Sequence, residues 1–336
     1  MNKYLIIGGG ITGVLLGSLL HKKGIAFQGL ERSKQIGKDF NFGQLRIHQD
    51  NTVGLLKDLC ESIDWIKIDE QPRERKKGEW ITSTNNYIDE EMAFLGNPFY
   101  RPTESTAVVL DMIKNSVRDL FLMEKNVEKI DLNKRIVYCQ NGSEYEFDHL
   151  AWCANLKSLT KIVQVTPKIA IKNQRKKDNS QGGIHLEMEL NNPLISFSNS
   201  VIFPFRYKDY KLRAIGINDS KPLSAAESYK MHWLVFLERE LAEDREEVAK
   251  IIRAMKRELQ KEFPELKTAP LREKIVFQPK VETHSPSEAK SLELFPGVFY
   301  VGPEIQLTDT LVNSSPWDIT LENCKRVENM LAQTTA

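Results

Sequence analysis

The fold of this 336-residue chain is decided by residues 4–13, which read YLIIGGGITG. Four apolar, β-favouring residues precede three glycines, and an apolar segment with helix-like spacing follows at 11–21. Gly24 then precedes a second strand-like segment at 25–30. This order predicts a β-strand, a helix and a second, parallel β-strand, with a glycine turn between the first strand and the helix.

The glycines at 8, 10 and 13 have the spacing G-x-G-x-x-G. In such a turn Gly8 permits a tight bend, Gly10 lets a pyrophosphate approach the backbone, and Gly13 lets the helix pack close to the strand. Ile11 and Thr12 begin the helix, whose free N–H groups and dipole favour phosphate. The motif therefore predicts a bound dinucleotide.

Glu31 ends the second predicted strand. An acidic side chain there can accept hydrogen bonds from ribose hydroxyls and would repel a 2′-phosphate, which disfavours NADP. The alternative is a chance glycine-rich turn in an unrelated α/β protein. The nucleotide site is favoured, because the sequence has the strand, the helix, Gly17 and Glu31 in the expected order.

The remaining pattern predicts further elements along the chain. We expect helices at 52–63, 105–117, 225–241, 245–263 and 316–332. We expect strands at 42–47, 127–130, 135–138, 184–190, 200–205, 211–217, 273–278 and 298–301, a strand containing Trp80, a turn at Asn141-Gly142, and a buried strand within 145–154. The basic tracts 73–77 and 175–177 are expected to be solvated loops.

Composition excludes several classes of protein. Hydrophobic residues make up 41% and charged residues 28%, as in ordinary globular proteins. The net charge of +1 gives no global attraction to nucleic acid or anionic lipid. We expect no integral membrane segment and no export signal, and the four scattered cysteines fit a reducing cytoplasm. The histidines are too widely spaced to predict a metal site.

Five segments together resemble the FAD-dependent amine oxidase and protoporphyrinogen oxidase superfamily, which includes renalase-like proteins of similar length. The His48 segment is also similar to UDP-galactopyranose mutase. The segments are KYLIIGGGITGVLLGSLLHKKG (3–24), LERS (30–33), NFGQLRIH (41–48), EFDHLAWCA (146–154) and FPGVFYVGPE (295–304).

The resemblance implies an α/β fold class, with a Rossmann-type FAD-binding domain and an inserted mixed α+β substrate domain. The FAD-binding domain is expected at 1–70, 101–160 and 281–336, the last part including the C-terminal helix. The substrate domain is expected at 71–100 and 161–280.

The resemblance also implies the residues that contact FAD. Two segments depart from the family pattern: Ile36-Gly37-Lys38 has one glycine where the family has a pair, and Gly302-Pro303-Glu304 has proline where the family has an acid. The expected cofactor residues are Gly8, Gly10, Ile11, Thr12, Gly13, Glu31, Arg32, Gln44, Val127, Gly302, Glu304 and Ser315.

The C-terminal helix and one strand are candidates for the flavin-facing side of the site. Ser315-Pro316 is a helix start, and resemblance puts this N-terminus at the flavin N1 and C2 carbonyl edge, where its dipole would stabilise negative charge. Arg46 and His48 alternate with Leu45 and Ile47, and are the candidate catalytic residues. The alternative for this strand is a plain surface-facing side.

Aromatic residues near 205 are the candidate substrate wall. Phe203, Phe205 and Tyr207 could enclose a flat or apolar substrate, while Arg206 could bind an acid group. The alternative is that this stripe belongs to the hydrophobic core.

The leading hypothesis is an FAD-dependent oxidoreductase that takes a hydride from a small organic substrate, possibly an amine, onto flavin N5. Oxygen or another acceptor would reoxidise the flavin. Two alternatives stay open. One is a degenerate nucleotide-binding protein of the same fold without redox activity, and the other is a flavin-dependent mutase whose reaction is not a net oxidation.

Overall fold

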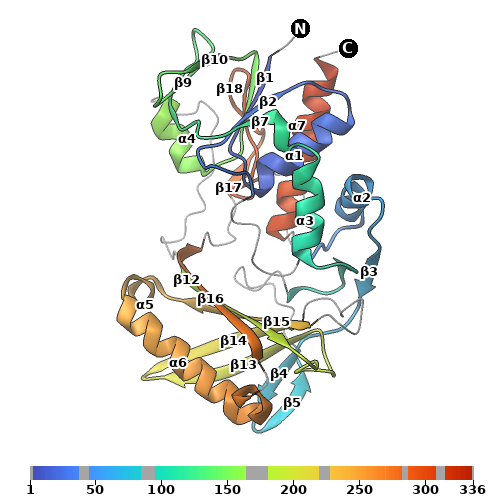
Figure 1. The fold of residues 1–336 in the computed structure, drawn as a ribbon, viewed down its shortest axis with the longest axis vertical. Helices are drawn as coiled ribbons and strands as arrows, with labels where there is room; N and C mark the ends of the chain where they lie inside the picture. The colour runs from blue at the N-terminus through green and yellow to red at the C-terminus, as the bar shows by residue number, and fades with distance from the viewer. Residues whose placement is uncertain are drawn as a thin grey trace.

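The computed structural model describes residues 3–37, 45–84, 95–163, 181–218, 228–268, 270–281, 287–307 and 315–334. Two large sheets, each with its own helices, lie one above the other in Figure 1. The N and C labels both lie at the end of the molecule that holds the upper sheet, the C label next to α7. Within the described residues, no helix is long and apolar enough to span a membrane.

The upper sheet has six strands, which come from three distant parts of the sequence. Its order is β18-β19-β11-β1-β2-β7, and only the β18–β19 pair is antiparallel. The strands are β1 (Tyr4–Ile7), β2 (Gln28–Leu30), β7 (Phe121–Leu122), β11 (His149–Trp152), β18 (Glu293–Phe295) and β19 (Val298–Tyr300). The central strand β1 is buried throughout, as a parallel strand covered on both faces requires.

Helices and short strands surround this sheet. Helix α1 contacts α7, α3 and α2. The helices are α1 (Ile11–Lys22), α2 (Asp50–Leu59), α3 (Thr106–Asn115), α4 (Leu156–Val163) and α7 (Pro316–Gln333), with a 3-10 turn at Arg118–Leu120. The short strands are β8 (Val127–Asp131), β9 (Ile136–Cys139) and β10 (Glu144–Glu146) in one sheet, and the pairs β3 (Trp65–Ile68) with β6 (Phe99–Pro102) and β17 (Ser287–Ala289) with β20 (Ile305–Leu307).

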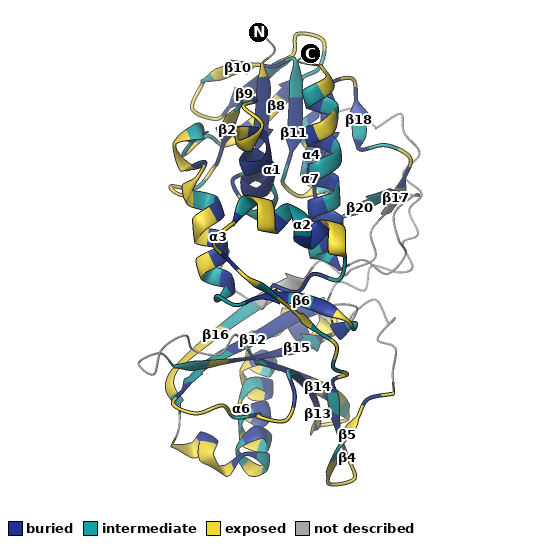
Figure 2. Ribbon diagram, turned by 90° about the vertical axis from the view of Figure 1, so that its right-hand side faces the viewer, coloured by how far each residue is buried: buried dark blue, intermediate teal, exposed yellow. Residues whose placement is uncertain are grey.

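The lower sheet has seven strands in the order β16-β12-β15-β14-β13-β4-β5. They are β4 (Arg73–Lys76), β5 (Glu79–Thr82), β12 (Gln181–Leu190), β13 (Ser200–Tyr207), β14 (Tyr210–Asn218), β15 (Tyr229–Leu237) and β16 (Pro270–Val281). Helices α5 (Arg239–Glu243) and α6 (Arg245–Glu262) and a 3-10 turn (Pro264–Lys267) follow β15. Figure 2 shows α6 on one face of this sheet, whose other face is turned toward β6 and the upper sheet.

Alternation along the strands separates the two faces of the lower sheet. Leu186 on β12 and Trp233 on β15 belong to the core cluster that includes the buried side of α6. Leu234, the next residue on β15, belongs to a second cluster on the opposite face. Leu95, which lies outside the sheet, is buried in that second cluster. The face opposite α6 is therefore partly covered by the segment that leads into β6.

Most of the expected elements are confirmed, including the first strand–helix–strand unit, the hairpin around Asn141-Gly142 and the helix from 245. The expected helix at 225–241 is wrong, because residues 229–237 form β15, an interior strand of the lower sheet. Its sequence YKMHWLVFL is rich in β-favouring side chains and buried on both faces, so helical spacing alone misleads.

Two further expectations need correction. Arg73–Lys76 is not a solvated loop but strand β4, whose Arg75 forms an ion pair of 2.9 Å with Glu262 of α6. In the segment expected as a strand at 42–47, Ile47 forms only an isolated bridge with Tyr100. Residues 42–44 and the basic tract 175–177 lie outside the described residues.

Glycine contacts give a direct test of the upper sheet. A Cβ atom on Gly29 would lie 2.2 Å from the ring of Phe121 on the neighbouring strand, whereas a Cβ on Gly54 in α2 meets no atom within 4 Å. We expect Gly29→Ala to lower the free energy of unfolding by about 1–3 kcal/mol through overpacking. Gly54→Ala should raise it by about 0.5–1 kcal/mol, because alanine favours the helix. Urea denaturation of both variants measures this, and equal effects would contradict the packing described.

Candidate functional site

The glycine turn after β1 is tight at two positions and open at the third. Gly8 has a φ of +104°, and a Cβ there would lie 3.0 Å from the carbonyl oxygen of Cys153. A Cβ on Gly13 would lie 1.8 Å from the carbonyl oxygen of Gly8, so α1 packs directly on the turn. A Cβ on Gly10 would meet no atom within 4 Å. The open space thus lies at the position where the motif expects a pyrophosphate.

Helix α1 begins at this open position. Gly10 is its N-cap residue and supplies no side chain, and the first turn contains no acidic residue. The backbone N–H groups at the start of a helix have no partner within the helix. Those of Ile11 and Thr12 therefore present a partial positive charge beside Gly10.

The carboxylate of Glu31 is turned toward the same glycines. One oxygen, Oε2, accepts a hydrogen bond of 2.6 Å from the Gly9 N–H, and Oε1 accepts one of 2.7 Å from the Ser33 N–H. The Gly37 N–H donates to the Gly9 carbonyl at 2.8 Å, which folds the 31–37 segment over the turn. Each carboxylate oxygen can accept more than one hydrogen bond. Glu31 thus organises the turn and keeps acceptor capacity for a hydroxyl group.

The neighbours of Glu31 differ in exposure. The side chain of Arg32 is exposed. Val127 is buried at the start of β8 and packs in the core cluster of the upper sheet. The Lys125 N–H donates to the Glu31 carbonyl at 2.8 Å and brings the start of β8 beside the end of β2. Gln44 lies outside the described residues.

Glu304 has a structural role that the sequence did not indicate. Its carboxylate accepts hydrogen bonds from the Leu156 N–H at the start of α4 (2.5 Å) and from the Tyr300 hydroxyl (2.8 Å). Asn323 of α7 donates to the carbonyl oxygens of Gly302 (2.8 Å) and Ile305 (2.9 Å). The turn after β19 is thus held by α4 and α7.

The N-terminus of α7 meets the backbone of residues 48 and 49. Ser315 caps the helix, accepting a hydrogen bond of 3.2 Å from the Asp318 N–H. The Asp318 carboxylate, which is 1% exposed, accepts hydrogen bonds from the His48 N–H (3.1 Å) and the Gln49 N–H (3.2 Å). The structure therefore brings together the strand and the helix start that the sequence picked out separately.

Arg46 is buried, which corrects the alternative of a surface-facing strand side. It is 2% exposed, and its guanidinium carbon lies 4.2 Å from the ring centre of Phe99 on β6. Leu45 and Ile47 are buried as well, so burial does not alternate here. Burial and, second, the charge of Arg101 lower the pKa of Arg46 to about 9. The His48 ring also lies near Phe99, with the two ring centres 6.2 Å apart.

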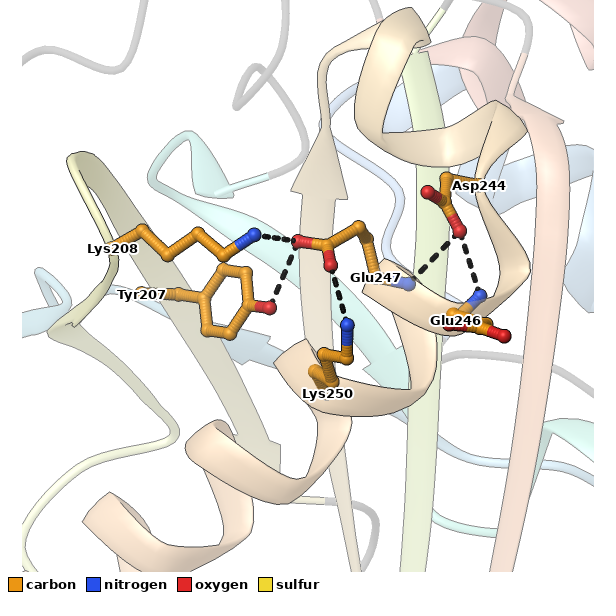
Figure 3. A network of polar contacts seen from close by, with 6 residues as sticks. All are labelled: Tyr207, Lys208, Asp244, Glu246, Glu247 and Lys250. Carbon is orange, nitrogen blue, oxygen red and sulfur yellow. Dashed lines mark hydrogen bonds and ion pairs between the residues drawn. The ribbon is translucent and has the colours of Figure 1, made fainter.

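The expected substrate wall is wrong, because its aromatic residues face α6. Phe203 and Phe205 are buried in the α6 core cluster. The Tyr207 hydroxyl donates a hydrogen bond of 2.9 Å to Glu247 on α6. Figure 3 shows Lys208 and Lys250 converging on the same carboxylate. Hydrogen bonds from these two lysines and from Tyr207 lower the pKa of Glu247 to about 2. Arg206 is exposed.

The opposite face of the lower sheet carries a histidine pair that the sequence analysis missed. His185 on β12 and His232 on β15 are 47 positions apart, yet their Nδ1 and Nε2 atoms lie 3.1 Å apart. Each histidine lies between two buried apolar residues of its strand, and this is the only sequence signal for the pair. Among the described residues, no group of three or more His, Cys, Asp or Glu could hold a metal ion.

Removing the charge of Glu31 tests its role in the turn. In Glu31→Gln, one of the two backbone N–H groups would face an amide NH2 instead of an acceptor. We expect a loss of about 1–3 kcal/mol in the free energy of unfolding, measured by urea denaturation without added nucleotide. Glu128→Gln, at an exposed position of β8, is the matched control and should stay within about 0.5 kcal/mol of the parent. Equal losses in both variants would argue against the hydrogen bonds described.

Acid titration tests the burial of His232. Burial and, second, the neighbouring His185 lower the pKa of His232 from 6.5 to about 3. Between these values the unfolded chain binds a proton that the folded chain does not, so stability falls as pH falls below about 6.5. At pH 5 this loss should be roughly 2 kcal/mol relative to pH 7. His232→Phe should remove that part of the pH dependence of unfolding, and an unchanged slope would contradict the assignment.

Comparison with known proteins supports the fold. No family model matches the sequence, and no curated protein matches it significantly. A solved structure from Pyrococcus furiosus is similar with a TM-score of 0.68 and 15% identity, covering 98% of this chain and 97% of that one. An oxidoreductase from Methanosarcina mazei has a TM-score of 0.66 and 12% identity, covering 97% and 100%. A Pseudomonas aeruginosa protein described as a probable FAD-dependent monooxygenase has a TM-score of 0.60 and 14% identity, covering 99% and 86%. The chain thus shares the α/β fold of these proteins over nearly its whole length.

Proposed function

We propose that this chain binds FAD and is a flavin-dependent oxidoreductase acting on a small organic molecule. The observation that carries the proposal is the glycine turn, which is closed at Gly8 and Gly13 and open at Gly10. A backbone opening at the start of an uncapped helix fits a pyrophosphate both sterically and electrostatically. The likeness in fold to oxidoreductases, one of them described as FAD-dependent, supports flavin rather than another dinucleotide.

Specific residues would hold the cofactor. The N–H groups at the start of α1, from Ile11 and Thr12, would bind the pyrophosphate, and Glu31 would accept hydrogen bonds from the adenosine ribose. The positions of Arg32 and Val127, beside the end of β2, fit contacts with the adenosine end. Gln44, Gly302 and Ser315 remain proposed contacts, and Glu304 would act indirectly, because its carboxylate holds the start of α4.

The domain division follows from the same proposal. Residues 1–70, 101–160 and 281–336 would form a Rossmann-type FAD-binding domain around the upper sheet. Residues 71–100 and 161–280 would form the inserted mixed α+β substrate domain around the lower sheet. The burial of Leu95 against the lower sheet, four residues before Phe99 of β6, supports a substrate site where the two parts meet.

The chain's own residues would prepare the flavin side of the site. Bound FAD would supply a two-electron acceptor. The start of α7 would present the Trp317 N–H and the positive end of its dipole, and Arg46 would add a buried positive charge, so that both stabilise negative charge on a neighbouring ring. The stacking of Arg46 on Phe99 fixes its guanidinium in place. His48, whose ring centre lies 6.2 Å from that of Phe99, would be the second catalytic candidate beside Arg46.

Two oxidative reactions fit this site. The first is hydride transfer from a small donor, possibly an amine, with reoxidation by oxygen or another acceptor. The second is hydroxylation, in which a separate two-electron donor such as a reduced nicotinamide nucleotide would reduce the flavin, one atom of O2 would enter the product and the other would leave as water. It is favoured by the likeness in fold to 2,6-dihydroxypyridine-3-hydroxylase from Arthrobacter nicotinovorans, which has a TM-score of 0.61 and 12% identity. Turnover under 18O2 separates them, because only hydroxylation places the heavy oxygen in the organic product.

Cofactor retention in a Gly10 variant tests the proposal. A Cβ at position 10 meets no atom within 4 Å, so Gly10→Val places side-chain bulk in the open space of the turn. We expect the purified parent protein, incubated with FAD, to retain it, as shown by a flavin spectrum and by mass after denaturation. The variant should retain less than a tenth of the parent's FAD and keep its melting temperature without cofactor within a few degrees.

Gly54→Val is the matched control, because a Cβ at Gly54 also meets no atom within 4 Å but lies in α2, away from the turn. It should retain FAD like the parent. A parent protein that ignores FAD would refute flavin binding. Retention by Gly10→Val equal to that of the control would refute the placement of the pyrophosphate.

A further inference from the structure

The hairpin formed by β13 and β14 has two different faces. One face packs on α6 through apolar side chains such as Phe205 and Leu212, which are buried in the α6 core cluster. Side chains alternate along each strand, so the residues next to these point to the opposite face. That face carries three exposed, positively charged residues, which we call the cationic face: Arg206, Lys211 and Arg213.

The three charges of the cationic face are close to one another. Arg206 and Lys211 are direct partners in the antiparallel register, where Cβ atoms lie about 4.5–5.5 Å apart. Arg213 follows Lys211 by two residues on β14, which is roughly 7 Å along the strand. Like charges placed directly opposite each other destabilise a strand pair. The hairpin therefore carries an electrostatic cost at its exposed surface.

The described part of the chain does not offset this cost. Neither an ion pair nor a side-chain hydrogen bond joins Arg206, Lys211 or Arg213 to another described residue. Lys208, at the turn of the same hairpin, does have an acidic partner, because it binds Glu247 of α6 at 2.6 Å. An anionic group from another molecule would offset the repulsion within the cationic face.

The hairpin is anchored from its other side. The Lys208 amine and the Tyr207 hydroxyl both donate to the Glu247 carboxylate, at 2.6 Å and 2.9 Å, as Figure 3 shows. Phe205 and Leu212 are buried directly behind the cationic face. Because the backbone is already fixed, a partner that binds here has only the ends of the charged side chains to order.

The cationic face lies at the exposed end of the sheet surface opposite α6. The pair Ile202 and Ile215 on this surface is buried in the cluster that also contains Leu95. The next pair on the same surface, Pro204 and Arg213, is exposed. The covered part of the sheet thus ends within one pair of residues, and the surface beyond it is accessible to a large molecule.

We propose that the cationic face docks an extended, acidic segment of a partner protein, with Asp or Glu at alternate positions. Small molecules bind in concave sites that bury most of their surface, whereas these three side chains are exposed on a strand surface. Alternate residues of an extended segment point to one side and lie roughly 7 Å apart, which is the spacing of Lys211 and Arg213. Arginine binds carboxylates through two parallel hydrogen bonds. Docking of this kind does not require bound flavin.

The experiment uses the full-length protein as purified and a fluorescent, capped peptide of sequence TETETET. Fluorescence anisotropy measures binding. We expect a dissociation constant below about 1 mM at low salt, because exposed ion pairs are individually weak. Raising the NaCl concentration from about 20 to about 300 mM should weaken binding at least fivefold through screening. The uncharged peptide TQTQTQT should not bind.

Charge removal locates the binding surface. We expect the combined variant Arg206→Gln, Lys211→Gln and Arg213→Gln to weaken peptide binding at least about tenfold.

The matched control removes the same total charge from three separate exposed positions, through Lys57→Gln, Lys161→Gln and Lys267→Gln. It should weaken peptide binding less than about threefold, because the removed charges are not grouped on one surface. Equal losses in the two combined variants would overturn the proposal, since they would show attraction to the total charge of the protein.

Stability distinguishes a docking role from a structural one. Arg206→Gln removes one member of a like-charged pair, so we expect its melting temperature to rise by about 1–2 °C. A fall of several degrees would show that Arg206 stabilises the hairpin and would overturn the proposal.

Three further outcomes would overturn the proposal. The first is a parent protein that does not bind the acidic peptide at low salt. The second is inorganic triphosphate that binds the same three residues more tightly than the peptide, which would indicate a phosphate site. The third is binding to vesicles of about 30% phosphatidylserine in phosphatidylcholine that the combined variant loses, which would indicate a membrane surface. None of these measurements depends on FAD retention, so failure of flavin binding gives a separate result.

Discussion

The close approach of helix α1 to the glycine turn is the constraint on which the site depends. A side chain at Gly13 would collide with the Gly8 carbonyl, so only glycine lets the first helical turn lie directly against the end of β1. That contact aims the N–H groups of α1 at the open space beside Gly10. The proposed pyrophosphate site depends on this local geometry.

Three carboxylates secure loops and helix starts around the upper sheet. Glu31 holds the N–H groups of Gly9 and Ser33, Asp318 holds those of His48 and Gln49, and Glu304 holds that of Leu156. Asp318 and Glu304 satisfy backbone donors of distant segments, and Glu31 satisfies one distant and one local donor. Charge-assisted hydrogen bonds of this kind are stronger than neutral ones, so they can fix loops that have no regular structure.

The two sheets meet through a short segment that ends in β6. Leu95 belongs to the apolar cluster of the lower sheet, whereas Phe99 lies under Arg46 and near His48. This arrangement explains why the proposed substrate side consists of the face opposite α6. The aromatic residues Phe203 and Phe205, by contrast, build the core under that helix.

The sequence by itself determined the glycine turn, Glu31 and the capped start of α7, because each depends on backbone geometry and helix ends that local residues specify. It also indicated most strands of the upper sheet. Only the tertiary structure decided that residues 229–237 form a strand, that Glu304 caps α4, and that His185 and His232 meet. Those outcomes depend on which strands pair across the sheet and on what covers each face, and hydrophobic spacing within one segment carries no information about either.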